Sequence, residues 1–74
     1  MNYYAVTSVL MRDGTATTST SPFETSAAAR QQMYQFFAQN IANENVDTLF
    51  AKVVTPLGDI IYEETFPVNP SEVN

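Results

Sequence analysis

The sequence predicts an α+β fold of the ββαββ kind, a two-layer sandwich in which one helix packs on one face of a four-stranded, mainly antiparallel sheet. Three observations lead to this prediction. Asp13-Gly14 is a turn signal between two runs with strand character, and Pro56-Leu57-Gly58-Asp59 is a second one. Between the two pairs of runs lies a segment whose apolar residues recur at helical spacing.

The first pair of runs predicts a hairpin. Residues 3–11 alternate with apolar side chains on both faces, which places this strand inside the sheet. Residues 12–15 form the turn, because Asp-Gly tolerates the positive φ angles of a type I′ hairpin. The return run before Pro22 is β-branched but polar, so it suits an edge strand, with a flexible Ser/Thr loop as the alternative.

The central segment predicts a helix over residues 26–43. Thr25 or Ser26 is placed to cap it, since a hydroxyl oxygen can accept a hydrogen bond from a free N–H of the first turn. The residues that share one stripe of this helix are Ala29, Met33, Phe36, Phe37 and Ile41.

The last two runs predict a second hairpin, with strands over residues 46–55 and 60–66 joined by the second glycine turn. The order 2-1-3-4 gives a wholly antiparallel sheet with the polar strand at one edge, and it is preferred. The rival order, 2-1-4-3, makes strands 1 and 4 parallel neighbours. The domain is predicted to span residues 1–66, with residues 67–74 as a flexible C-terminal tail.

One helix covers only one face of such a sheet, so the other face is predicted to be a contact surface. Its candidate residues are the aromatic and aliphatic side chains Tyr3, Tyr4, Phe50, Val54 and Tyr62. The alternative is that long side chains and the tail, through Val68 and Val73, cover this face.

The composition argues against several chemistries. The chain has 74 residues with no cysteine and no histidine, which removes disulfides, thiolate metal sites and the commonest general base. No glycine-rich phosphate-binding motif and no calcium-loop spacing occurs. We therefore expect no catalytic residue, no metal and no cofactor, and predict that the chain is not an enzyme.

The charge also limits the partners. The net charge is −5, and three scattered basic residues do not make the basic patch that nucleic acid or an anionic membrane requires. The first residues lack the features of a signal peptide, and no apolar run reaches the roughly 18 residues of a membrane span. The prediction is a cytoplasmic protein that binds neither nucleic acid nor membrane.

Short motifs along the chain resemble those of small uncharacterised ββαββ proteins of about 70 residues from bacteria, phages or mobile elements. The motifs are Arg12-Asp13-Gly14-Thr15, Phe23-Glu24-Thr25, Ala28-Ala29-Arg30, Phe36-Phe37 and the run from Gly58 to Glu64. They are turn, cap and helix-stripe features. The resemblance implies the fold and carries no activity or functional residue with it.

These observations favour a non-enzymatic protein–protein interaction module or a homodimer. The alternative is an acidic inhibitor that mimics nucleic acid and blocks a basic enzyme surface, which requires the acids to gather on one face. An enzyme or small-ligand binder requires a concave pocket, which a sandwich with one helix rarely provides.

Overall fold

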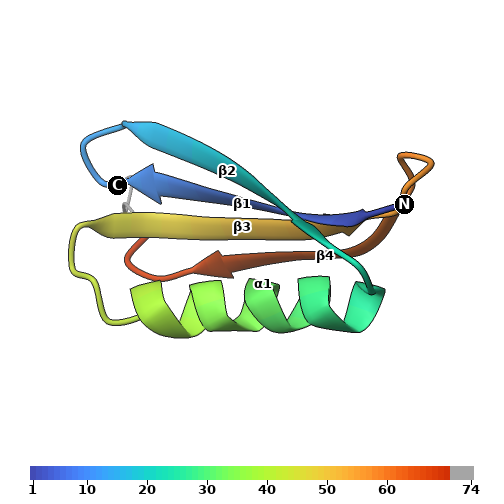
Figure 1. Ribbon diagram of the computed structural model, residues 1–74. Coiled ribbons are helices and arrows are strands. Elements are labelled where there is room, and N and C mark those ends of the chain that lie inside the picture. Colours follow the sequence, from blue (N-terminus) through green and yellow to red (C-terminus); the bar gives the residue numbers. More distant parts are fainter. Residues whose placement is uncertain (71–74) are drawn as a thin grey trace.

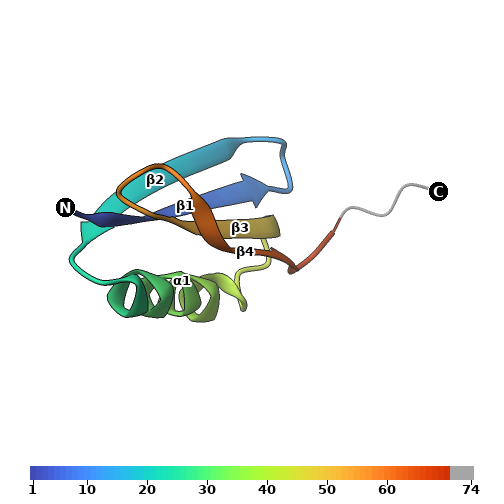
Figure 2. The ribbon, with the colours of Figure 1, turned by 90° about the vertical axis from the view of Figure 1, so that its right-hand side faces the viewer.

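The computed structural model describes residues 1–70. The elements follow in the order β1 (Tyr3–Met11), β2 (Ala16–Phe23), α1 (Ser26–Asn40), β3 (Val46–Val54) and β4 (Ile60–Pro67). The sheet has the order β2-β1-β3-β4, and every neighbouring pair is antiparallel. Helix α1 runs along one side of this sheet (Figures 1 and 2). The predicted ββαββ sandwich and the strand order 2-1-3-4 are confirmed.

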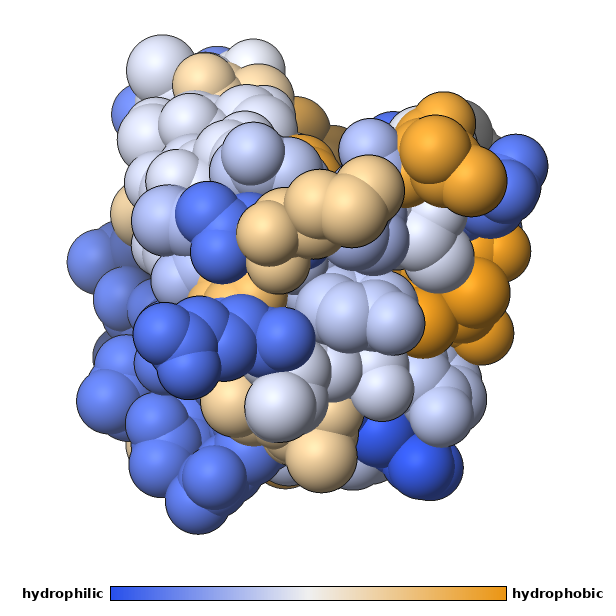
Figure 3. Space-filling model, turned by 45° about the vertical axis from the view of Figure 1, so that its right-hand side comes forward, coloured by the Kyte–Doolittle hydropathy of each residue, from blue (hydrophilic) through white to orange (hydrophobic). Residues whose placement is uncertain are grey.

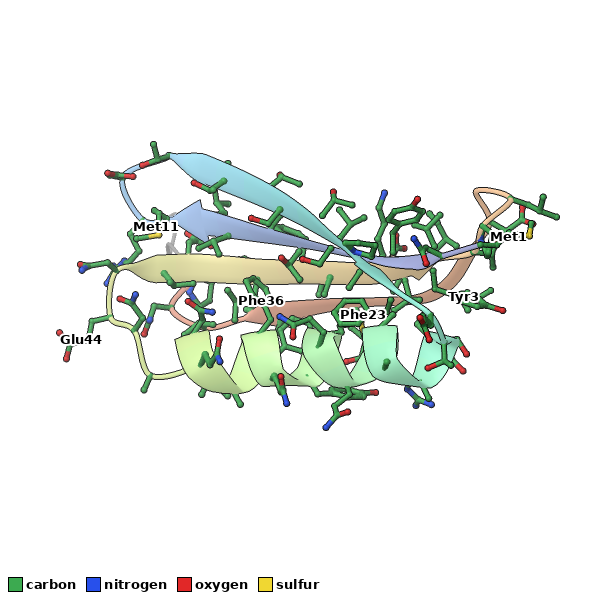
Figure 4. The ribbon with its side chains drawn as sticks, in the orientation of Figure 1. Met1, Tyr3, Met11, Phe23, Phe36 and Glu44 are labelled. Atoms are coloured by element: carbon green, nitrogen blue, oxygen red, sulfur yellow. The ribbon has the colours of Figure 1, made fainter. Side chains whose placement is uncertain are left out.

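The core lies between the helix and the sheet. Helix α1 buries Ala29, Met33 and Phe37 against the sheet. The strands contribute the buried residues Ala5, Val46, Leu49, Ala51 and Val53. Figure 4 shows the side chains of Phe23 and Phe36 between the two layers, where both pack against this cluster. All buried side chains of the described part are apolar, so burial of aliphatic and aromatic surface stabilises the fold.

Both hairpins close with loops of one geometry. The N–H of Met11 donates to the carbonyl of Thr15, and the N–H of Thr55 donates to that of Asp59, each at 2.8 Å. The last loop residue is a glycine in the left-handed region, with φ of +93° at Gly14 and +96° at Gly58. The predicted type I′ turn is wrong, because no other described residue has positive φ. Each loop instead has a single left-handed position, which glycine fills without steric cost.

Side chains reinforce these turns. Asp13 Oδ1 accepts hydrogen bonds from the hydroxyl and the backbone N–H of Thr15. These bonds favour the carboxylate and lower the pKa of Asp13 below its ordinary value. In the second turn the N–H of Asp59 donates to Thr55 Oγ1 at 3.0 Å.

The helix begins as predicted and ends three residues early. Thr25 is the cap, since its Oγ1 accepts a hydrogen bond from the N–H of Ala28 at 3.1 Å. The last helical residue is Asn40 rather than residue 43, and the N–H of Ile41 donates to the carbonyl of Phe37. Asn40 Nδ2 also donates to the carbonyl of Phe36, one turn back, at 2.8 Å.

Strand β2 continues past the proline that was expected to end it. Pro22 lies opposite Tyr4, and the strand extends to Phe23, opposite Tyr3. Because β2 is an edge strand, it tolerates a residue that has no N–H to donate.

The residues directly after β4, which belong to the predicted tail, make hydrogen bonds to the domain. The N–H groups of Val68 and Asn69 both donate to the carbonyl of Asp47, at 2.9 and 3.1 Å. Asn69 Nδ2 donates to the carbonyls of Asn43 and Val46, each at 3.0 Å. Val68 packs against the core cluster and not over the open side of the sheet. Val73 and the rest of the predicted tail beyond Pro70 lie outside the described residues.

We predict that Gly58→Ala lowers the free energy of unfolding by about 1–2 kcal/mol, because alanine is strained at positive φ. A Cβ at this position meets open space, so the backbone alone carries the cost. Urea unfolding monitored by circular dichroism measures the effect. Gly58→Asn is the control and should lose less, and equal stability of the alanine variant and the parent protein would contradict the assigned turn.

A second prediction concerns the end of the chain. Asn69→Ala removes two hydrogen bonds and should lower the free energy of unfolding by about 1–2 kcal/mol. The control is Asn2→Ala, an exposed asparagine at the opposite terminus, which should be neutral. If both variants unfold at the same urea concentration as the parent, the contacts of Asn69 do not hold the domain together.

Candidate functional site

The face of the sheet that points away from α1 carries a cluster of exposed apolar side chains at one end. In the row nearest the β3–β4 turn, Tyr4 lies opposite Val54, which in turn lies opposite Ile60. Ile60 is 51% exposed and Leu57, in the turn itself, is 83% exposed. We call the residues Tyr4, Val54, Leu57, Ile60 and Ile61 the apolar end. Figure 3, which brings this end of the molecule forward, shows hydrophobic side chains gathered toward its right-hand side.

A β-bulge gives the apolar end its second isoleucine. Tyr62 is paired with Val53, and Ile60 is paired with Val54, so Ile61 is an extra residue in β4. Pairing with Val54 places Ile60 on the open face, and strand alternation from Tyr62 places Ile61 there as well. The bulge therefore gathers two large aliphatic side chains where a regular strand would place one.

The rest of the open face is mixed. The next row sets Val6 beside Lys52 and Lys52 beside Glu63. The row after it sets Phe50 between Ser8 and Thr65, and Ser8 shares a hydroxyl hydrogen bond of 2.9 Å with Thr18. Side chains of these two rows line a shallow hollow of about 190 Å³. This volume is below the 300–1,000 Å³ typical of small-molecule sites, so the face suits a flat contact better than a ligand.

The structure divides the five residues predicted for this face. Tyr4, Phe50 and Val54 lie on it, on neighbouring central strands. Placing Tyr3 and Tyr62 there is wrong, because both lie on the helix side and pack against the core cluster. Tyr3 alternates in phase with the buried Ala5, a pattern that the sequence already contains.

Sequence reasoning missed Ile60 and Ile61 as members of this surface. Regular alternation groups Ile60 with Tyr62 and Phe66 on one face, and the bulge breaks that alternation. Two adjacent isoleucines directly after a turn are the only sign of the extra residue. Leu57 was also missed, since it was read only as part of a turn.

On the helix side, a groove runs along α1 and has Tyr62 of β4 as its one lining residue from a strand. The helix packs mainly on β1, β3 and β2, and it meets β4 through Phe37 on Phe66 and Arg30 over Tyr62. The groove has a volume of about 620 Å³, and its lining residues are Ser26, Ala27, Arg30, Gln31, Tyr34, Gln35, Ala38 and Tyr62. Phe66, farther along β4, packs against the ring of Phe37 with the centroids 6.0 Å apart.

Arg30 is held between two tyrosines at this groove. Its guanidinium lies 4.5 Å from the ring centroid of Tyr62 and 5.7 Å from that of Tyr34. It also donates a hydrogen bond to the hydroxyl of Tyr34 at 3.4 Å, which raises the pKa of Arg30 above its ordinary value. Arg30 is therefore a permanent cation whose position is fixed by aromatic rings.

Within residues 1–70, no three acidic side chains lie close enough to hold a metal ion. The acids Glu63 and Glu64 follow each other in β4, where alternation sends them to opposite faces. In this part of the chain the helix is too short and too polar to cross a bilayer.

Comparisons with protein-family models, with curated proteins and with solved structures gave no match to this sequence. The resemblance to small bacterial and phage proteins therefore stays a prediction.

The assignment of the two sheet faces can be tested with neighbouring residues of β3. Leu49 is 0% exposed on the helix side, whereas Phe50 is 40% exposed on the open face. Leu49→Ala should lower the free energy of unfolding by about 2–5 kcal/mol, because it leaves a cavity in the core. Phe50→Ala should cost less than about 1 kcal/mol in the monomer. Urea unfolding of dilute protein measures both losses. If Phe50→Ala lowers the free energy of unfolding more than Leu49→Ala does, the helix covers the other face.

Proposed function

We propose that this chain is a non-enzymatic interaction protein that forms a homodimer through the open face of its sheet. The observation that carries the proposal is the apolar end, where Tyr4, Val54 and Ile60 form one continuous row across three strands. Scattered apolar residues on a surface are ordinary, but a contiguous group at one place is typical of a contact site.

The dimensions of the face suit such a contact. Four strands spaced by about 4.8 Å, each about eight residues long, give a face of roughly 19 by 26 Å. A standard interface buries about 800 Å² of accessible surface on each partner, which a corrugated face of this size can approach. Two sheets that pack in this way lie about 10 Å apart, as in a β-sandwich.

The charges on the face are compatible with a two-fold arrangement. Lys52 and Glu63 are neighbours in the second row, so the face carries one charge of each sign near its middle. In an isologous dimer the same patch meets its own copy, and Lys52 of one copy can face Glu63 of the other. The apolar end then supplies the stabilisation and the charged row fixes the orientation.

The acidic-inhibitor alternative receives less support. Among the described acids, Glu24 precedes α1, Glu44 follows it, and Asp13 and Asp59 lie in the two hairpin turns. A mimic of nucleic acid needs its acids along one stripe, and these are spread over different edges and ends of the fold. The same proposal places the protein in the cytoplasm, since a chain without cysteine suits a reducing compartment.

Sedimentation equilibrium tests the proposal. The protein should show twice the chain mass of 8.2 kDa at micromolar to millimolar concentration. The double variant Val54→Lys, Ile60→Lys should weaken dimerisation at least about tenfold, because it would bury lysines in the contact. The matched control is Gln31→Lys, Gln35→Lys, which adds the same charge on the exposed side of the helix and should dimerise like the parent. A parent protein that stays monomeric at millimolar concentration would overturn the proposal.

A further inference from the structure

Strand β4 is an edge that is left open in the described part of the molecule. It is the last strand of the sheet, and all its residues except Tyr62 are exposed. An uncovered strand edge presents N–H and C=O groups that can pair with another strand. In the opposite edge, β2, Pro22 is the next-to-last residue, whereas the only proline of β4 is its last residue, so β4 has the longer run of residues with a backbone N–H. The two edges therefore differ, and β4 is the better template.

The groove along α1 reaches β4 at Tyr62. Its helical lining runs from Ser26 to Ala38, a length of about 18 Å, which corresponds to roughly five residues of extended chain. Ala27 and Ala38 leave room in it, and Tyr34 and Tyr62 form aromatic walls. A strand added to β4 would place a side chain over this groove beside Tyr62, and strand addition gains its specificity from such contacts.

The charges along β4 favour a basic partner strand. The strand has Glu63 and Glu64 at its centre, Asp59 just before it, and no basic residue. The nearest bases belong to other elements: Lys52 on β3 and Arg30 on α1. If two copies of β4 paired antiparallel about the strand's centre, the glutamates of one would meet those of the other, and like charges directly opposite are destabilising. A basic segment would instead place one basic side chain beside Glu63 on the open face and the next one beside Glu64 on the helix side.

We propose that β4 docks an extended basic segment of a partner protein, which adds to the sheet as a fifth strand. The segment carries two adjacent basic residues opposite Glu63 and Glu64 and small apolar residues over the groove. This site shares Glu63 with the open face. Its strand pairing runs along the outer edge of β4 and does not require the homodimer.

The probe is the capped peptide Val-Thr-Val-Lys-Lys-Val-Thr-Val, titrated into the ¹⁵N-labelled full chain. Binding should saturate, with the largest amide shifts in β4 and slower amide exchange along its outer edge. The peptide with Glu-Glu in place of Lys-Lys should bind about tenfold more weakly, since each cross-strand charge pair changes from attractive to repulsive. The basic peptide with alternate amides N-methylated should also lose about tenfold, because it cannot complete the ladder.

Charge-swap variants sharpen the test. Glu63→Lys, Glu64→Lys should reverse the preference and bind the acidic peptide more tightly. Glu63→Gln, Glu64→Gln, a milder change at the same exposed positions, should bind both peptides equally. The matched control Glu24→Lys, Glu44→Lys has the same net charge as the first variant and should keep the parent's preference. Absence of saturable binding at 2 mM peptide, shifts centred on β2 or the open face, or reversal by the control variant would each overturn the proposal.

Discussion

The packing of one helix against one face of the sheet is the constraint on which the rest of the molecule depends. Every buried side chain of the described part belongs to this single layer, and all of them are apolar. A domain of this size buries only about 60% of its unfolded surface, so it has no second core to draw on. The open face must therefore consist mainly of residues that tolerate water, as Ser8, Thr18 and Thr65 do. The apolar end departs from this requirement, and for that reason we treat it as functional.

Much of the fold could be predicted because local signals and overall topology agree in this chain. The two glycines stand at the only left-handed positions of the described part, where the chain reverses after β1 and after β3. The helix is long enough to return the chain along the sheet, which makes β1 and β3 antiparallel neighbours. The polar return run could be placed at an edge because hydroxyl side chains contribute little packing.

The surface was harder to predict, because the face on which a strand residue lies depends on where a bulge interrupts the alternation of side chains. The bulge in β4 takes Ile60 out of phase with Tyr62, and one residue of register decides which face a side chain joins. The end of the helix was also misplaced. The helix ends at Asn40, and the turn residues that follow carry no glycine to mark the stop. Asn69 makes hydrogen bonds to Asn43 and Val46, which lie 26 and 23 residues earlier, and no local sequence pattern predicts such distant contacts.

The central claim is that a second copy of the chain covers the open face at its apolar end. Isotope-filtered nuclear Overhauser spectroscopy on a mixture of labelled and unlabelled protein tests this most directly, because it detects contacts only between copies. The account predicts intermolecular signals from the methyl groups of Val54 and Ile60 to the ring of Tyr4. Intermolecular signals that arise only from helix α1 or from β2, or none at millimolar concentration, would contradict it.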